Sequence, residues 1–428
     1  MSQDIKDSLD ARKTVTAVFI DFEDAFGSVW KMKLLDKTMK LNINGNMLRW
    51  IYSFINQRWC ATKYGNATSK YKQMKIGLPQ GSVLSPTLFN IMINDLPTKL
   101  NKNENINCTL YADDLTIWTS TPRNLQYKLN SQINNAIVSL ERWCKDNYME
   151  INTNKTFYKI FSLTHSAPEI HLKINGQNIQ QQEYIKYLGV YLDRKLTWEH
   201  YIKTTIEKVN RRNNILKRLA RIKWGCSRNV LNNTYKTYIK PVLLYGGENL
   251  VTANNANLNK LEIAQNNSLR LITGSAKSTP IKAMQILTKN NPITHQINKQ
   301  ALLQYEKLIR YPHNNYWSNY KNTQRNLKTQ YGFMQKALEL QRKYNPNQKP
   351  EKLVLPISPL EDSEIEYNTN LIEHVLKNDK SPNELKQITL ETIHSFYPES
   401  QWLHIYTDGS RMEIEDGAGA GIYSKLFS

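Results

Sequence analysis

The chain has 428 residues, with 57 Lys and Arg against 37 Asp and Glu, and a formal net charge of +20. This length predicts two to four domains of about 100 to 200 residues each. Hydrophobic residues make up 40% and charged residues 22%, which excludes a wholly disordered chain. No window approaches the ~20 consecutive apolar residues of a membrane span, and the first residues lack the apolar stretch of a signal peptide. We therefore expect a soluble, intracellular protein with no membrane partner.

The four cysteines give no sign of a metal site or of a disulfide framework. Cys60, Cys108, Cys144 and Cys226 are far apart, and no CxxC pair or histidine cluster accompanies them. We expect reduced thiols.

The positive charge is concentrated in one part of the sequence. The net charge is +7 over residues 1–200, +21 over residues 201–350 and −8 over residues 351–428. Such an excess favours a polyanionic partner, and nucleic acid is the commonest one. A solvated helical surface and a membrane surface are the alternatives.

The first half of the chain shows alternating strand and helix patterns. The apolar run at 14–22 predicts a buried strand that ends near Asp21, and residues 31–60 predict two helices. Pro86 begins another helix, and residues 108–119 predict a hairpin around Asp113-Asp114. The predicted elements that follow are a helix at 124–147, a strand at 155–163 and paired strands at 184–192.

The second half is mostly helical and then changes in composition. Residues 202–223 combine a helically spaced apolar stripe, which includes Ile215, with basic side chains elsewhere. The aromatic residues Trp224, Tyr235, Tyr238 and Tyr245 are interpreted as core. Residues 345–370 contain four prolines followed by acidic residues, which is typical of a linker. The last segment reads as two strands.

The placement of two acidic residues suggests metal chemistry. Asp21 and Asp113 each lie at the end of a strand-like run, so both could meet at one edge of a sheet. Paired carboxylates on rigid strands are suitable ligands for two Mg²⁺ ions in nucleotidyl transfer. The alternative is that Asp113-Asp114 forms only a polar turn.

Five motifs occur in order along the chain. They are VFIDFEDAF at 18–26, GLPQGSVLSPTLFNIMINDL at 77–96, YADD at 111–114, INTNKT at 151–156 and YLGVYLD at 187–193. In order and spacing they resemble the palm motifs of reverse transcriptases, above all those of non-LTR retrotransposon (LINE) enzymes of the jockey-like group. IYTDGS and GAGAG at 405–421 are similar to the start of a retroelement RNase H domain.

The resemblance implies a fold and a division of the chain. The fold class is α+β, with a polymerase palm of antiparallel strands on helices, a helical thumb and connection, and a truncated RNase H-like end. The implied parts are a palm with partial fingers over 1–165, a primer grip and thumb over 166–230, a helical connection over 231–344, an acidic Pro-containing linker over 345–400 and a truncated RNase H-like start over 401–428.

The resemblance also implies roles for individual residues. Asp21 and Asp113 match metal ligands, Asp114 is the accompanying carboxylate, and the backbone of Phe22 faces a metal. The implied cofactor is a pair of Mg²⁺ ions, with Mn²⁺ as the alternative. Asp408 matches the first metal-binding carboxylate of RNase H.

Substrate contacts follow from the same likeness. Phe26 matches the aromatic steric gate that excludes a 2′-hydroxyl, although a core aromatic is the alternative. Gln80 and Gly81 match the loop that supports the incoming nucleotide and the template. Lys155 matches a lysine that protonates pyrophosphate, although a lone lysine is usually just solvated. The primer grip implied by the likeness consists of Tyr187, Leu188 and Gly189. The thumb side chains expected to contact nucleic acid are Arg211, Arg212, Lys217, Arg218, Arg221 and Lys223.

The sequence departs from the family pattern at Gly27, where relatives usually carry Asp. The fingers strands and an endonuclease that precede the first palm motif in relatives are not expected here, and no ribonuclease activity is expected. The function implied is an RNA-directed DNA polymerase that adds dNTPs to a DNA primer on an RNA template, in the nucleus. The alternative is a catalytically inactive fragment that only binds nucleic acid. An RNA-dependent RNA polymerase is disfavoured by Phe26 and by the RNase H-like tail.

Overall fold

The computed structural model describes residues 1–101, 105–164, 168–221, 225–310, 320, 324–344, 370–373, 375, 380–402 and 404, and the backbone of 406–411 and 418–423. The chain divides into two compact units, Met1–Leu353 and Val354–Ser428. Among the described residues, no helix has the length and apolar character needed to cross a bilayer.

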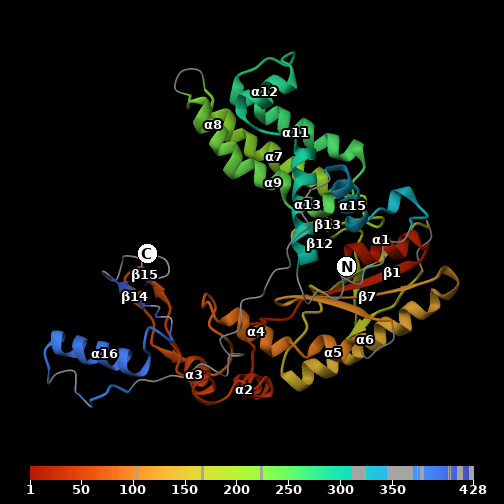
Figure 1. Cartoon of the computed structure of the whole chain (residues 1–428). Helices are drawn as coiled ribbons and strands as arrows, with labels where there is room; N and C mark the ends of the chain where they lie inside the picture. Colours follow the sequence, from red (N-terminus) through yellow and green to blue (C-terminus); the bar gives the residue numbers. More distant parts are fainter. Residues whose placement is uncertain are drawn as a thin grey trace. The chain divides into compact units, whose positions relative to one another are not determined.

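A five-stranded sheet forms the centre of the first unit (Figure 1). The strand order is β11 (Gln180–Gln181), β8 (Phe157–Phe161), β1 (Thr14–Ile20), β7 (Asp114–Thr121) and β6 (Asn107–Tyr111). All neighbours are antiparallel except β11, which runs parallel to β8. β1 is buried along its whole length, which explains why it reads as a continuous apolar run.

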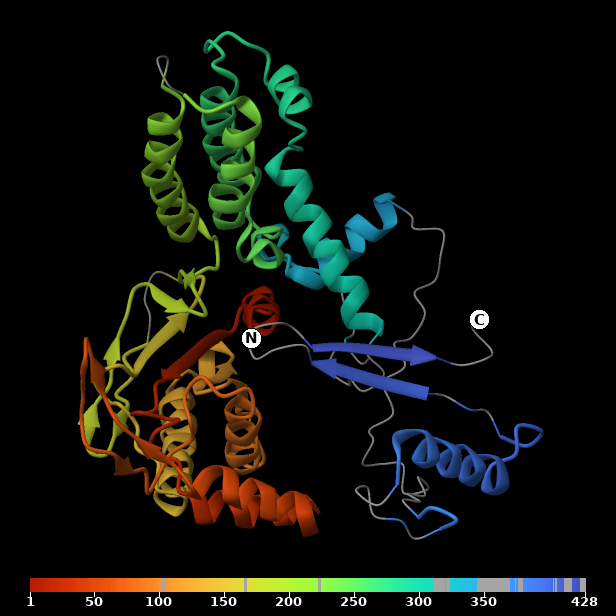
Figure 2. The same cartoon turned by 90° about the vertical axis from the view of Figure 1, so that its left-hand side faces the viewer.

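The two faces of the sheet belong to two different cores. Val18 and Ile20 pack in one cluster with residues of α6 (Tyr127–Asn147), which runs beside α5 (Leu96–Leu100) along the sheet (Figure 2). Ala17 and Phe19 point to the other face, because successive residues of a strand alternate. That second core includes α1 (Ser2–Asp10) and the helices that follow the sheet.

Helices and short strands that precede the β6–β7 hairpin in the chain make up the part next to the sheet. α2 (Lys31–Lys40) and α3 (Gly45–Asn56) are followed by the short paired strands β2 (Trp59–Cys60), β5 (Lys72–Gln73), β3 (Lys63–Tyr64) and β4 (Ala67–Thr68). α4 (Ser85–Ile93) comes next and has Pro86 in its first turn, as predicted.

Two small hairpins lead from the sheet to a helical bundle. They are β9 (Lys173–Ile174) with β10 (Gln177–Asn178), and β12 (Ile185–Tyr187) with β13 (Val190–Leu192). The described helical elements that follow are α7 (Glu199–Leu219), α8 (Arg228–Thr234), the π-helix η2 (Tyr235–Ile239), α9 (Lys240–Leu244), α10 (Gly247–Leu250), α11 (Asn255–Thr273), α12 (Ile281–Thr288), α13 (Ile293–Arg310), η3 (Lys328–Gln330) and α15 (Phe333–Tyr344).

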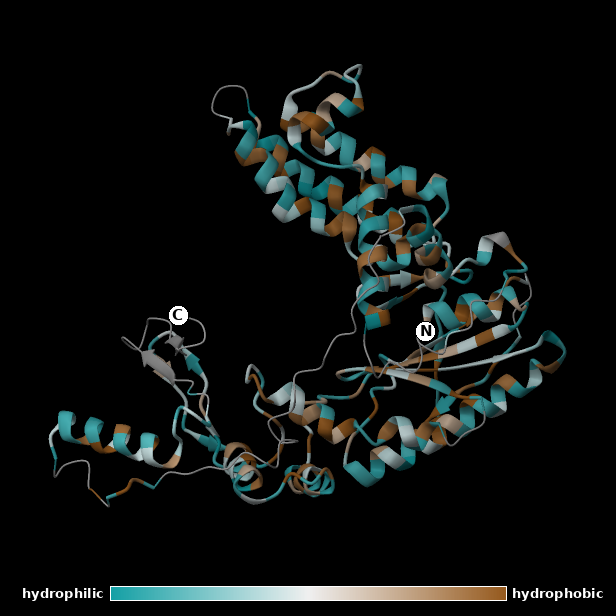
Figure 3. Ribbon diagram, viewed as in Figure 1, coloured by the Kyte–Doolittle hydropathy of each residue, from teal (hydrophilic) through white to brown (hydrophobic). Residues whose placement is uncertain are grey.

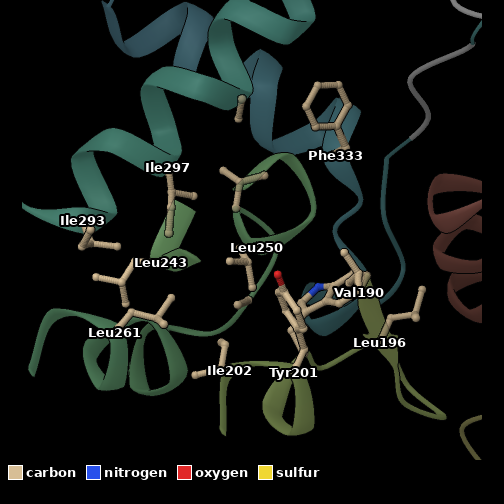
Figure 4. Packing of buried hydrophobic residues seen from close by; sticks show 14 of the residues in the cluster. Val190, Leu196, Tyr201, Ile202, Leu243, Leu250, Leu261, Ile293, Ile297 and Phe333 are labelled. Carbon is tan, nitrogen blue, oxygen red and sulfur yellow. The ribbon is translucent and has the colours of Figure 1, made fainter. Parts of the chain in front are cut away.

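One apolar core joins this bundle to the sheet. Val190 of β13 and Leu196 lie beside Tyr201 and Ile202 of α7, and helices α10 and α13 supply Leu250 and Ile297 (Figure 4). The helices α7, α11 and α13 carry both hydrophilic and hydrophobic segments, as amphipathic helices do (Figure 3).

Polar contacts connect the first helix to the end of the bundle. The Arg325 guanidinium, of which 4% is exposed, forms an ion pair with Asp7 of α1 and lies 4.0 Å from Asp10. Gln3 donates a hydrogen bond of 3.1 Å to Gln335. These contacts hold Arg325 and Gln335 against α1.

The second unit contains a helix and two strands. α16 (Pro382–Phe396) begins with a capping box in which Ser381 and Glu384 bond each other's backbone amide. It lies within the segment predicted as a linker, and residues 345–369 of that segment lie outside the described residues. β14 (Tyr406–Arg411) and β15 (Ala418–Tyr423) are antiparallel. The predicted pair of strands is present, and their assignment to an RNase H domain stays a prediction.

The predicted α+β fold is confirmed, with three corrections in the helical part. The helix predicted to 223 ends at Leu219. Ile215 is exposed, because a helix longer than its contact surface turns some periodic positions towards solvent. Tyr235 is buried as predicted, whereas Tyr238 and Tyr245 are exposed rather than core residues. Trp224, which was also assigned to the core, lies outside the described residues.

Candidate active site

Three carboxylates come together at one end of the central sheet. Ile20 of β1 faces Leu115 of β7, so the adjoining residues Asp21 and Asp114 lie at the same end. Tyr111 faces Asp114 across the β6–β7 hairpin, which leaves Ala112 and Asp113 at its turn. Ala112 has φ of +52°, a left-handed conformation that costs an alanine about 1 kcal/mol. The register therefore brings the predicted Asp21, Asp113 and Asp114 to one place.

The electrostatics of Asp114 agree with this arrangement. Burial raises the pKa of the Asp114 carboxyl, and the negative charges of Asp113 and Asp21 raise it further. Like charges couple in this way only at short range. A cation at this end of the sheet would relieve the repulsion.

Asp21 is held by its backbone, and its side chain has a basic neighbour. The Asn152 amide donates to the Asp21 carbonyl at 2.8 Å, and the Asp21 amide donates to the Thr156 hydroxyl at 3.3 Å. The Lys155 ammonium lies 3.8 Å from the Asp21 carboxylate and is 71% exposed. An exposed pair of this kind adds little stability, so its effect is on the local charge.

The aromatic residues of the first motif have different surroundings. Phe22 is buried and forms a β-bridge with Ile151. Phe26 is half-buried, and its ring stacks on Phe89 of α4 with a centroid distance of 4.6 Å. Phe26 therefore combines contact with the core and partial exposure.

The glycine-rich loop lies directly against the first motif. The Leu78 amide donates to the Phe26 carbonyl at 2.8 Å, and the Gly77 amide donates to the Val29 carbonyl at 2.9 Å. Gly77 has φ of +80°, and a Cβ there would meet the backbone of Gly27. Gly77 therefore requires glycine for this close approach.

The predicted residues Gln80 and Gly81 are exposed on the same loop, just before α4. Ser85, at the start of α4, fixes the loop because its hydroxyl donates to the Pro79 carbonyl at 2.6 Å.

The space beside Gly27 is taken by another carboxylate. A side chain at Gly27 would collide with the Asp24 carboxylate, and Asp24 itself has φ of +41°. The acidic group that relatives carry after Phe26 is thus absent from position 27, while Asp24 supplies a carboxylate next to it. The sequence analysis did not single out Asp24, because the motif does not show that the Asp24 carboxylate lies next to Gly27.

The predicted primer grip forms a strained turn between β12 and β13. Leu188 has φ of +45° and Gly189 has φ of +81°. The Tyr245 hydroxyl donates to the Leu188 carbonyl at 2.7 Å, and a Cβ on Gly189 would lie 3.0 Å from the Tyr245 ring. The Tyr201 hydroxyl in turn donates to the Tyr245 carbonyl at 2.9 Å. Tyr245 therefore positions the turn.

A cleft lies between the predicted primer grip and the β6–β7 hairpin. It has a volume of about 470 Å³, and its lining includes Tyr111 of β6, Tyr187, Leu188 and Tyr245. The Tyr187 ring packs edge-on against Phe19 of β1 at 5.4 Å, and burial raises the pKa of the Tyr187 hydroxyl.

The predicted basic residues of the thumb have different environments. Arg211, Lys217 and Arg218 are exposed on α7, and Arg221 is exposed just after it. The Arg212 guanidinium lies over the Tyr238 ring at 4.3 Å and donates to the Tyr238 carbonyl, so it is engaged within the chain. Lys223 lies outside the described residues, and so does the side chain of Asp408 on β14.

No three His, Cys, Asp or Glu side chains of the described residues form a group that could hold a metal ion by themselves. A site built on Asp21 and Asp113 would take its remaining oxygens from the backbone and from a phosphate-bearing substrate.

The first part of the chain is similar to known proteins. Residues 2–192 match the family model described as "Reverse transcriptase (RNA-dependent DNA polymerase)". The RNA-directed DNA polymerase from mobile element jockey of Drosophila melanogaster is 30% identical over 63% of this chain and 29% of its own length. The probable RNA-directed DNA polymerase from transposon BS of the same species is 28% identical over 64% of this chain and 30% of its own length. The chain thus spans about a third of these relatives.

Among solved structures, telomerase from Candida albicans in complex with a telomeric RNA fragment is similar at 14% identity, with a TM-score of 0.34, over 75% of this chain and 52% of that chain. The family match ends at the last residue of the grip hairpin, so it contains the carboxylates, the glycine-rich loop and the grip. Residues 2–192 therefore match the reverse transcriptase family model, and the chain is similar to the polymerases of jockey and of transposon BS.

Proposed function

We propose that this chain is an RNA-directed DNA polymerase that adds deoxynucleotides to the 3′-hydroxyl of a DNA primer on an RNA template. The observation that carries the proposal is the convergence of Asp21, Asp113 and Asp114 at one end of the sheet, within a reverse transcriptase domain. By the same family relation we place its action in the nucleus.

The donor set suits the divalent metal ions that reverse transcriptases generally use. Asp21 and Asp113 offer carboxylate oxygens on rigid backbone, and the mutual repulsion that raises the pKa of Asp114 favours cation binding. We propose that Asp21, Asp113 and the Phe22 carbonyl hold two Mg²⁺ ions, or Mn²⁺ instead, with Asp114 as the accompanying carboxylate. When bound, such ions lower the pKa of the attacking hydroxyl and stabilise charge on the transferred phosphate.

The other residues of the site position the nucleotide. Gln80 and Gly81 are exposed on the loop whose Leu78 amide is bonded to Phe26, so a nucleotide can approach this loop closely. Phe26 is fixed by stacking on Phe89, so its remaining surface can act as a rigid floor that rejects a 2′-hydroxyl. The Lys155 ammonium, beside Asp21, is suited to donate a proton to the leaving pyrophosphate.

The primer and the duplex require the remaining surfaces. The strained turn of Leu188 and Gly189, next to the cleft of about 470 Å³, is suited to hold the primer end near Asp113. Exposed Arg211, Lys217 and Arg218 on α7 are suited to contact backbone phosphates, which gives affinity without sequence specificity.

The test is primer extension on an RNA template with Mg²⁺ and dNTPs. Asp113→Asn/Asp114→Asn should reduce extension by a factor on the order of a thousand, because the charge that holds the metal ions is removed. Duplex binding, measured by fluorescence anisotropy, should be retained. The matched control is Asp36→Asn/Asp146→Asn, which neutralises a partly exposed and an exposed carboxylate elsewhere and should leave extension intact.

Two results would contradict the proposal. Loss of both extension and binding in the Asp113→Asn/Asp114→Asn variant would show that these residues are structural. An unmodified chain that binds the duplex in a salt-dependent way and never extends the primer would be the nucleic-acid-binding fragment without catalysis.

A further inference from the structure

The segment from Gln57 to Ile76, called the ribbon below, is a two-stranded β-ribbon between α3 and α4 (the orange segment after α3 in Figure 1). Trp59 faces Gln73, and Tyr64 faces Ala67 near the tip. The Met74 amide donates to the Arg58 carbonyl at 3.0 Å and closes its base. No family motif identified in the sequence lies in the ribbon.

The ribbon exposes large aromatic side chains that no core explains. Trp59 is 63% exposed, Tyr64 is 89% exposed and Tyr71 is 72% exposed. An isolated two-stranded ribbon has no packed face of its own and is marginally stable, so aromatic residues on it contribute little to folding. Exposed aromatics in this number mark a binding surface.

The charge of the ribbon indicates what binds there. Between Gln57 and Ile76 the sequence has five basic residues and no acidic one. Trp59 and Tyr71 share one face, because Tyr71 lies two residues before Gln73, the partner of Trp59. Aromatic rings beside basic side chains are the combination that binds single-stranded nucleic acid, by stacking on bases and by contacts to phosphates. A protein partner would not require the absence of acidic residues.

The ribbon is attached to the loop at which the template is expected. The Arg58 guanidinium donates to the Gly77 carbonyl at 2.9 Å. Gly77 and Leu78 are bonded in turn to the first motif, and Gln80 and Gly81 follow them. An RNA template that leaves the templating position over this loop therefore meets the base of the ribbon.

We propose that the ribbon binds the unpaired part of the template, with Trp59 and Tyr71 stacking on its bases and the basic residues contacting its phosphates. The location rests on the proposed function, whereas single-strand binding by the ribbon does not.

The test uses the full chain and a matched pair of tyrosines. Tyr71→Ala should weaken binding of a fluorescently labelled single-stranded RNA about tenfold. Tyr127→Ala, at a tyrosine of α6 that is 71% exposed, should leave binding unchanged. Lys72→Gln is a second variant that keeps the aromatic residues, and it should reduce the slope of log affinity against log salt by about 1.

Primer-extension assays then test whether the unpaired part of the template lies on the ribbon. Tyr71→Ala should lower the ratio of extension on a template with an overhang of about 16 nucleotides to extension on one with a single unpaired nucleotide. Normal RNA binding by both Tyr71→Ala and Trp59→Ala/Tyr71→Ala would overturn the proposal and leave a protein partner as the occupant. If Tyr71→Ala loses RNA binding and the unmodified chain extends neither template, single-strand binding by the ribbon is supported and polymerase activity is refuted.

Discussion

Replacing Tyr245 by Phe removes one hydroxyl and keeps the ring that contacts Gly189. The hydroxyl donates to the Leu188 carbonyl at 2.7 Å, and Tyr245 is 53% exposed, so water can take over part of this bond. A hydrogen bond of this kind contributes about 1 kcal/mol, which corresponds to about a fivefold change in an equilibrium constant. Because Leu188 and Gly189 both have positive φ, the turn has alternative conformations to relax into once the bond is lost.

We expect Tyr245→Phe to raise the KM for primer–template about fivefold in steady-state extension, with a smaller effect on kcat. Tyr245→Ala should have a larger effect, because the ring contact to Gly189 is lost as well. Tyr127→Phe is the matched control, since its side chain is exposed on α6 away from the grip. The reasoning is refuted if Tyr245→Phe and Tyr245→Ala both leave the KM for primer–template unchanged, or if Tyr127→Phe raises it equally.

Three further substitutions have defined outcomes. Burial lowers the pKa of Lys6 from 10.5 to about 8, so charged Lys6 costs the folded state about 3 kcal/mol at pH 7. Lys6→Met should stabilise the protein by that order in urea titrations, and the gain should shrink between pH 8 and pH 10.5, where native Lys6 is neutral. Gly27→Asp should lower primer extension despite restoring the family residue, because a second carboxylate is placed against that of Asp24 and the Asp24 side chain has to turn away. Arg325→Met should lower the free energy of unfolding by about 2 kcal/mol or more, since Asp7 loses its ion-pair partner, and calorimetry would show a lower Tm.

The parts of the fold that depend on local sequence were predictable. The strand that ends before Asp21 and the hairpin at Asp113-Asp114 are given by short apolar runs with turn residues between them. The register that brings the carboxylates together follows from antiparallel pairing of two such runs. For Asp21 and Asp113, the family motifs and the strand pattern therefore predict the same placement.

The parts that depend on contacts between distant residues were not predictable. Tyr245 looks like a core aromatic in a helical segment, and its bond to Leu188 spans 57 positions of the chain. Ile215 fits the apolar period of its helix and is nevertheless exposed, because periodicity does not show where the contact surface ends. Asp24 is inconspicuous until the backbone conformation brings its carboxylate to Gly27.

The bond between Arg325 and Asp7 joins residues 318 positions apart. A ribosome that adds about 5 to 20 residues per second needs about 15 to 60 seconds to synthesise that stretch. During this time Ile5 and Leu9, which are fully buried in the finished protein, lack the part of their surroundings that the late residues provide. The first helix can pack on β1 as soon as that strand is made, but its remaining apolar surface is covered only when the late residues arrive.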